Sequence, residues 1–96
     1  MGSFSDYLES LKNTPEYMAA CISEAFSESV WRIRRRQHMT QKDIAVKAGF
    51  RPSYVSEILS GRRKLSVEAV CKIAHALNCD VKFEIVPKEC GKNDPA

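Results

Sequence analysis

The chain has 96 residues, 44% of them hydrophobic and 28% charged, which is enough for one small domain with a modest core. It carries a formal net charge of +3 and four cysteines, which show no short metal-binding spacing such as Cys-x-x-Cys. Neither a signal-peptide pattern nor a long apolar run is visible, so we expect a cytoplasmic protein without a membrane span. The composition therefore argues against a disulfide-rich secreted domain and against a membrane protein.

The charge is unevenly distributed along the chain. Residues 31–72 hold eleven Lys or Arg against three acids, a net charge of +8, whereas residues 1–30 carry −4 and residues 73–96 carry −1. A basic centre is typical of a protein that binds nucleic-acid phosphates, although a merely solvated basic face would give the same count.

A helix is predicted to begin at Thr14. Thr14 is a suitable N-cap, Pro15 suits the first helical position, and Glu16 is favoured by the helix dipole. No Gly or Pro follows before residue 38. Apolar residues recur at helical spacing, namely Met18, Ile22, Ala25, Phe26, Val30 and Ile33. The stretch is either one long helix or two helices joined near residues 27–29.

Residues 39–61 predict two short helices joined by a tight turn. Thr40 is a suitable N-cap, and Asp43 three residues later completes the capping-box pattern. Gly49 stands where the first helix must end with a positive φ, and Pro52 suits the first turn of the second helix. The predicted inward positions are Ile44, Ala45, Ala48, Val55, Ile58 and Leu59. This is a helix-turn-helix, the unit that places its second helix in the DNA major groove.

The last predicted helix is capped by Ser66 and ends near Leu77, with Asn78 in the left-handed conformation after it. Its predicted buried face comprises Val67, Val70, Cys71, Ala74 and Leu77. Residues 81–86 then alternate in character and predict a strand, with Val81, Phe83 and Ile85 on one face. A lone strand leaves its backbone groups unpaired, so it either pairs with the same strand of a second copy or is a strand-like tail on the core.

Residues 29–79 resemble the Cro/lambda-repressor-type (XRE) helix-turn-helix domain. The matching features are Ile33-Arg34, Thr40-Gln41, Ala45, Gly49, Ser53-Tyr54-Val55-Ser56, Gly61, Ile73-Ala74 and Ala76-Leu77. Two positions depart from the family. Arg51 stands where a Ser or Thr cap usually precedes the second helix, and Leu59 stands where the family often has a Glu that pairs with the arginine at the Arg34 position.

We therefore predict an all-α fold, a compact lambda-repressor-like bundle with one dimerising β-strand. The predicted parts are an N-terminal helical extension (1–28), the helix-turn-helix domain (29–79), the strand (80–88) and a disordered tail (89–96).

The predicted DNA contacts are of two kinds. The candidate base-reading residues are Arg51, Pro52, Ser53, Tyr54, Ser56 and Glu57. An arginine can bind guanine O6 and N7 in bidentate fashion, whereas Glu57 either accepts from a cytosine amino group or orients a neighbouring arginine. The candidate phosphate-binding residues are Gln41, Ser60, Arg62, Arg63 and Lys64, and the resemblance implies this role for Gln41 in particular. Arg34 either contacts DNA or links helices.

The predicted function is that of a transcriptional repressor, with no cofactor, metal or enzymatic activity. His38 and His75 stand alone, without partners at catalytic or metal-ligand spacing. A homodimer would read an inverted repeat in double-stranded DNA. One copy makes only a few base contacts, and two copies on two half-sites would give a usable specificity.

Two kinds of regulator remain open: a stand-alone or phage-type repressor, and an antitoxin that also neutralises a RelE/HigB-type toxin. Residues 74–88 resemble the tail of HigA-like antitoxins, and residues 7–26 resemble the N-terminal extension of small antitoxins encoded beside such toxins. The resemblance favours the antitoxin. Its expected partner-binding residues are Tyr7, Leu8, Leu11, Tyr17 and Trp31, the last of which is either an interface anchor or a cover for the N-terminal segment.

Overall fold

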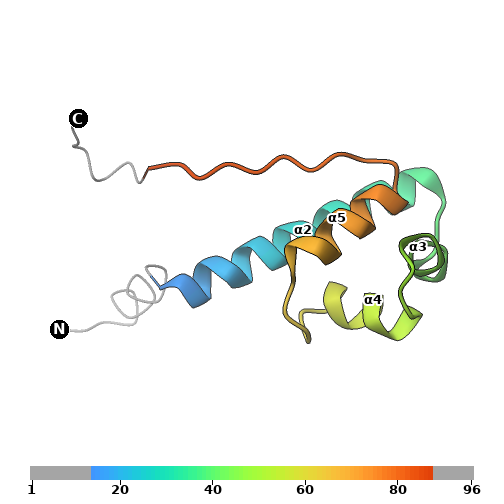
Figure 1. Cartoon of the computed structure of the whole chain (residues 1–96), viewed down its shortest axis with the longest axis horizontal. Coiled ribbons are helices and arrows are strands. Elements are labelled where there is room, and N and C mark those ends of the chain that lie inside the picture. Colours follow the sequence, from blue (N-terminus) through green and yellow to red (C-terminus); the bar gives the residue numbers. More distant parts are fainter. Residues whose placement is uncertain (1–13, 88–96) are drawn as a thin grey trace.

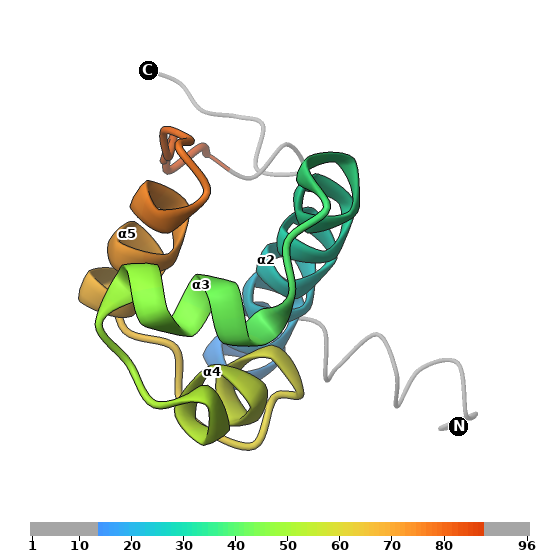
Figure 2. The same cartoon turned by 90° about the vertical axis from the view of Figure 1, so that its right-hand side faces the viewer.

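The computed structural model describes residues 14–87, which form four helices and no paired strand. The helices are α2 (Pro15–Gln37), α3 (Gln41–Ala48), α4 (Pro52–Leu59) and α5 (Val67–Ala76). The first part of the long helix α2 projects beyond the other three helices (Figure 1). Seen from the end, α3 crosses between α5 and α2, with α4 packed beneath it (Figure 2).

The predicted caps fix the ends of the helices. The Oγ1 atom of Thr14 accepts a hydrogen bond from the Tyr17 N–H at 3.1 Å, and Ser66 Oγ accepts one from the Ala69 N–H at 3.0 Å. Asn78 has a φ of 60°, as predicted for the residue that follows the last helix. Between Thr14 and residue 37 the helix is unbroken, which answers the question of one helix or two in favour of one.

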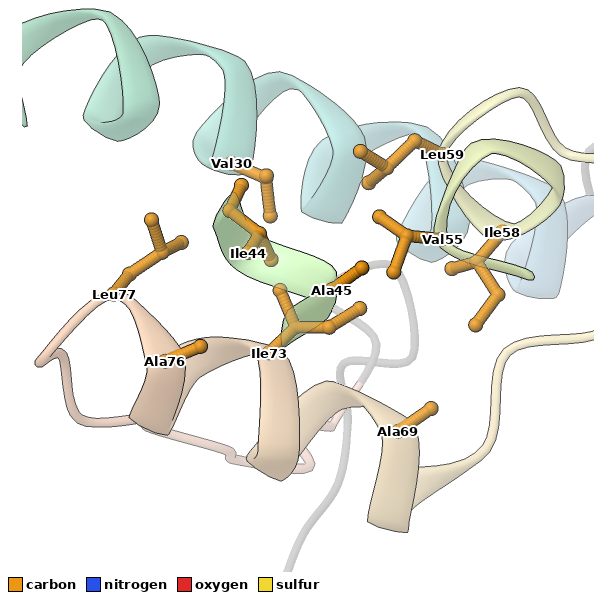
Figure 3. Close-up of a cluster of buried hydrophobic side chains, with 10 residues drawn as sticks. All are labelled: Val30, Ile44, Ala45, Val55, Ile58, Leu59, Ala69, Ile73, Ala76 and Leu77. Carbon is orange, nitrogen blue, oxygen red and sulfur yellow. The ribbon is translucent and has the colours of Figure 1, made fainter. Parts of the chain in front are cut away.

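The core is a cluster of apolar side chains to which all four helices contribute (Figure 3). Ile44, Ile58 and Ile73, from three different helices, have no exposed surface. The full cluster comprises Val30, Ile44, Ala45, Val55, Ile58, Leu59, Ala69, Ile73, Ala76 and Leu77. Every described residue predicted to lie inward in the helix-turn-helix is buried except Ala48, which is half-buried.

The predicted buried face of α5 was partly wrong. Val67 is 81% exposed and Cys71 is also exposed, whereas Ala69, Ile73 and Ala76 are buried. The helix α5 has apolar residues on two neighbouring faces. Helix α3 packs against the face that contains Ala69 and Ala76. Small side chains let helix backbones approach closely, so this face forms the contact although Val67 and Val70 are the larger residues.

The apolar repeat of α2 is covered only in its second half. Met18 and Ile22 are 53% and 50% exposed, whereas Val30 is 3% exposed. Phe26 and Ile33 are half-buried against the core cluster. None of the described helices is both long enough and apolar enough to cross a membrane.

Residues 80–87 follow α5 as an extended trace without helix or paired strand (Figure 1). Phe83 and Ile85 are 80% and 86% exposed. Pairing of a lone strand would need a second chain, so the predicted strand and its dimerising role stay predictions. Residues 1–13 and 88–96, with the predicted tail and the candidates Tyr7, Leu8 and Leu11, lie outside the described residues.

Candidate nucleic-acid interface

The first helix of the motif, α3, begins with the predicted capping box. The Asp43 N–H donates to Thr40 Oγ1, and the Thr40 N–H donates to Asp43 Oδ2, both at 3.0 Å. Hydrogen bonds from the backbone and side chain of Thr40 lower the pKa of Asp43 from its ordinary value of 3.8. The exposed carboxylate is therefore held ionised as part of the cap.

The turn between α3 and α4 depends on Gly49, whose φ is 79°. The Phe50 N–H donates to the Ala45 carbonyl at 2.9 Å, which closes the end of α3. Arg51 then takes an extended conformation, and Pro52 occupies the first turn of α4. Arg51 makes no side-chain cap for α4. Its exposed guanidinium is thus left available at the helix start.

Helix α4 separates buried from outward residues as predicted. Val55, Ile58 and Leu59 are buried in the core, and the candidate base-reading residues lie on the rest of the helix and at its start. Arg51, Pro52, Ser53 and Ser56 are exposed, whereas Tyr54 and Glu57 are half-buried. An open hollow of about 490 Å³ brings several of them together. It is lined by Gly49, Phe50, Arg51, Ser53, Tyr54, Glu57 and Arg63.

The candidate phosphate-binding residues lie in two places. Ser60, Arg62, Arg63 and Lys64 are exposed in the segment that follows α4, whereas Gln41 is half-buried at the first position of α3. The Ser60 hydroxyl donates to the Glu57 carbonyl at 3.2 Å.

Glu57 is paired with Arg63 rather than free. The Nε and Nη2 atoms of Arg63 each lie 2.9 Å from Glu57 Oε1. The guanidinium carbon of Arg63 lies 5.1 Å from the centre of the Tyr54 ring, within range of a cation–π contact. Of the two roles predicted for Glu57, this geometry favours orientation of a neighbouring arginine.

The sequence did not predict the aromatic residues Phe50 and Tyr54 that pack beside the Glu57–Arg63 pair. The rings of Phe50 and Tyr54 are 4.7 Å apart, and Lys72 Nζ from α5 lies 5.5 Å from the Phe50 ring centre. The signal in the sequence was an aromatic residue just before the N-cap of α4 with a tyrosine four positions later, since a residue that precedes the N-cap can pack against the first turn of the helix.

Arg34 contacts the turn between α2 and α3, which favours the structural role among its two predicted alternatives. Its Nη1 donates to the Met39 carbonyl at 2.8 Å, and its guanidinium carbon lies 4.3 Å from the centre of the exposed Trp31 ring. Its Nε is buried and has no hydrogen-bond partner among the described residues. Leu59 of α4 is buried in the core and carries no carboxylate that could pair with Arg34.

The fold and this surface define a helix-turn-helix protein: α3 supports, α4 presents an outward face, and a basic segment follows it. The helix-turn-helix family model matches residues 32–83, more than half of the chain. The chain therefore belongs to the helix-turn-helix family, in its XRE type, and the matched domain is a DNA-binding regulatory domain, not a catalytic one. No curated protein and no solved structure matches it.

Proposed function

We propose that the protein is a repressor that binds an inverted-repeat operator as a homodimer. The observation that carries this proposal is the outward surface of α4 and its start, where Arg51, Ser53 and Ser56 are exposed within the +8 segment of the chain. Arg51 would read guanine, Ser53 a base edge or phosphate, and Arg62 and Lys64 of the loop would bind phosphates.

The dimer is supported by the exposed apolar side chains of residues 81–86. In an extended chain Val81, Phe83 and Ile85 share one face, and no other part of the described chain covers Phe83 or Ile85. A two-fold pairing of this segment with itself would satisfy both its backbone groups and its apolar face.

Binding to duplex DNA tests the proposal. Selection from a randomised duplex library should enrich two half-sites in inverted orientation, about 34 Å or a multiple of that apart. Affinity should fall steeply with salt, because each neutralised phosphate releases counterions. Arg51→Ala should relax the preference at one base position per half-site while leaving the others unchanged. A library that yields no enriched sequence, or an affinity independent of salt, would contradict the proposal.

We further propose that this repressor is the antitoxin of a toxin–antitoxin module, a role favoured over a stand-alone repressor by one specific observation. The projecting half of α2 leaves Tyr17, Met18 and Ile22 between 41% and 53% exposed. Exposed apolar side chains gathered on one helix are typical of a protein interface. Tyr7, Leu8 and Leu11 would extend this interface, Trp31 would lie at its far end, and the acids of residues 1–30 would face a basic, RNA-cleaving toxin.

Co-expression with the product of the neighbouring reading frame tests this role. The two proteins should co-purify, and Tyr17→Ala with Ile22→Ala should weaken the complex without weakening operator binding. If the neighbouring gene encodes no small basic protein, or its product stays unbound while the operator is still recognised, the stand-alone repressor is the better description.

A further inference from the structure

Glu57 and Arg63 form a side-chain pair beside the proposed base-reading residues. Both contacts from Arg63, through Nε and Nη2, converge on Oε1 of Glu57 at 2.9 Å. The side chains remain 37% and 52% exposed respectively. An exposed ion pair of this kind adds little to the free energy of unfolding, so a stabilising role does not account for it.

Glu57 occupies only one of the two edges of the Arg63 guanidinium. A guanidinium has a side edge made of Nε and Nη2 and an end edge made of Nη1 and Nη2. Glu57 takes the side edge, and Nη1 has no hydrogen-bond partner among the described residues. The end edge is the fork that matches guanine O6 and N7, the commonest specific pairing in the major groove.

Two further contacts define where this fork lies. The guanidinium carbon is 5.1 Å from the Tyr54 ring centre, and Tyr54 rests on Phe50. Arg63 also lines the same open hollow as Arg51 and Ser53. The carboxylate and the ring thus restrict a side chain that would otherwise lose considerable rotamer freedom on binding a base.

We propose that Arg63 reads a guanine, and that Glu57 is the positioning residue that holds its side edge while the end edge faces the base. This assigns Arg63 to base recognition rather than to phosphate clamping, and assigns Glu57 an indirect role. The inference rests on the proposed DNA-binding function.

The test compares base preferences of matched variants of the full chain. A randomised duplex library gives the preferred sequence of the wild type. Titrations then measure affinity for duplexes in which each preferred guanine is replaced by the other bases or by 7-deazaguanine, which lacks the N7 acceptor. Arg63→Ala should abolish a preference of roughly 5- to 150-fold at one guanine. Arg63→Lys should abolish it too while keeping the salt dependence, since it retains the charge but not the fork.

Glu57→Gln should weaken the preference at that same guanine, and its effect should vanish when Arg63 is already alanine. Arg62→Ala is the matched control: its side chain is exposed and makes no hydrogen bond or ion pair with the described part of the chain, so all duplexes should weaken alike. The inference fails if Arg63→Ala weakens all duplexes alike, or if Glu57→Gln changes a different base position. Failure of the proposed function is a separate result, in which the wild type selects no sequence at all.

Discussion

Two parts of the described chain contrast in how they use apolar residues. The helical bundle, meaning residues 26–37 of α2 with α3, α4 and α5, buries most of its apolar side chains in one core cluster, although Val46 and Val67 are exposed. The two flanks, meaning residues 15–25 of α2 and residues 80–87, leave theirs largely in solvent. The apolar repeat of α2 continues across the boundary, so the repeat itself does not decide burial. A turn of α2 is buried only where α4 or α5 packs against it.

The flanks therefore expose apolar surface that no other part of the described chain covers. Single exposed apolar residues are normal in soluble proteins, but here they recur along one helix and along one extended segment. The bundle already forms a complete core without them. Substitutions in the bundle should therefore affect folding, and substitutions in the flanks should affect assembly.

The largest expected effect comes from Ile44→Ala in the bundle, paired with Ile22→Ala in the flank. Ile44 has no exposed surface, so its truncation leaves a cavity and should lower the free energy of unfolding by about 2–5 kcal/mol. Ile22 is 50% exposed, and the same truncation should change stability by less than about 0.5 kcal/mol. Urea unfolding followed by circular dichroism measures both.

If Ile44→Ala does not fold, Ile44→Val keeps the comparison measurable, with an expected loss of about 0.5–1.5 kcal/mol. Equal losses from the two alanine variants would show that the flank is packed as tightly as the bundle.

The next effect concerns assembly through the C-terminal flank. Phe83→Asp places two like charges at a two-fold strand pairing and should raise the dimer dissociation constant at least about tenfold, or about 1.4 kcal/mol. Its melting temperature at low protein concentration should stay unchanged. Lys82→Ser, on the opposite face of an extended chain, is the control. Sedimentation equilibrium would contradict the dimer interface if wild type and Phe83→Asp have the same mass at every concentration.

The helices of the bundle could be predicted from sequence because local chemistry decides them. Thr14, Thr40 and Ser66 each act as a cap, and Gly49 takes the positive φ that its position requires. The buried face of α5 could be predicted only in part: Ala74 and Leu77 are buried as expected, whereas Ala69, Ile73 and Ala76 are buried because of where α3 packs. Local signals identify a helix, and packing against distant residues identifies its inward side.

The candidate site likewise has one part that the sequence predicts and one part that depends on the fold. The outward residues of α4 follow from the helical repeat once Val55, Ile58 and Leu59 are placed inward. The contact between Glu57 and Arg63 spans six residues and depends on the path of the chain after α4, in which Gly61 has a φ of 82°. The sequence offered orientation of an arginine only as an alternative role for Glu57 and did not say which arginine.

A smaller effect is expected at the turn that joins the two helices of the motif. A Cβ at position 49 would meet no atom within 4 Å, so Gly49→Ala adds only the strain of a positive φ, about 1 kcal/mol. Gly49→Asn should cost less, because asparagine tolerates this conformation. Chemical denaturation of both variants measures the difference. Equal stability of wild type and Gly49→Ala would mean that the turn relaxes freely and does not hold α4 in place.

The smallest effect is a pH dependence located at the start of α3. The folded state lowers the pKa of Asp43 below 3.8, so the ionised cap contributes stability above the pKa of the unfolded chain. That contribution is lost as the pH falls from about 4 through the lowered folded value, because the carboxylate must then take up a proton. Asp43→Asn removes the titrating group and should flatten this part of the profile. Thermal unfolding of both proteins between pH 7 and pH 2.5 gives the comparison. A profile for Asp43→Asn as steep as that of the wild type would show that the capping box of α3 is not the source of the acid sensitivity.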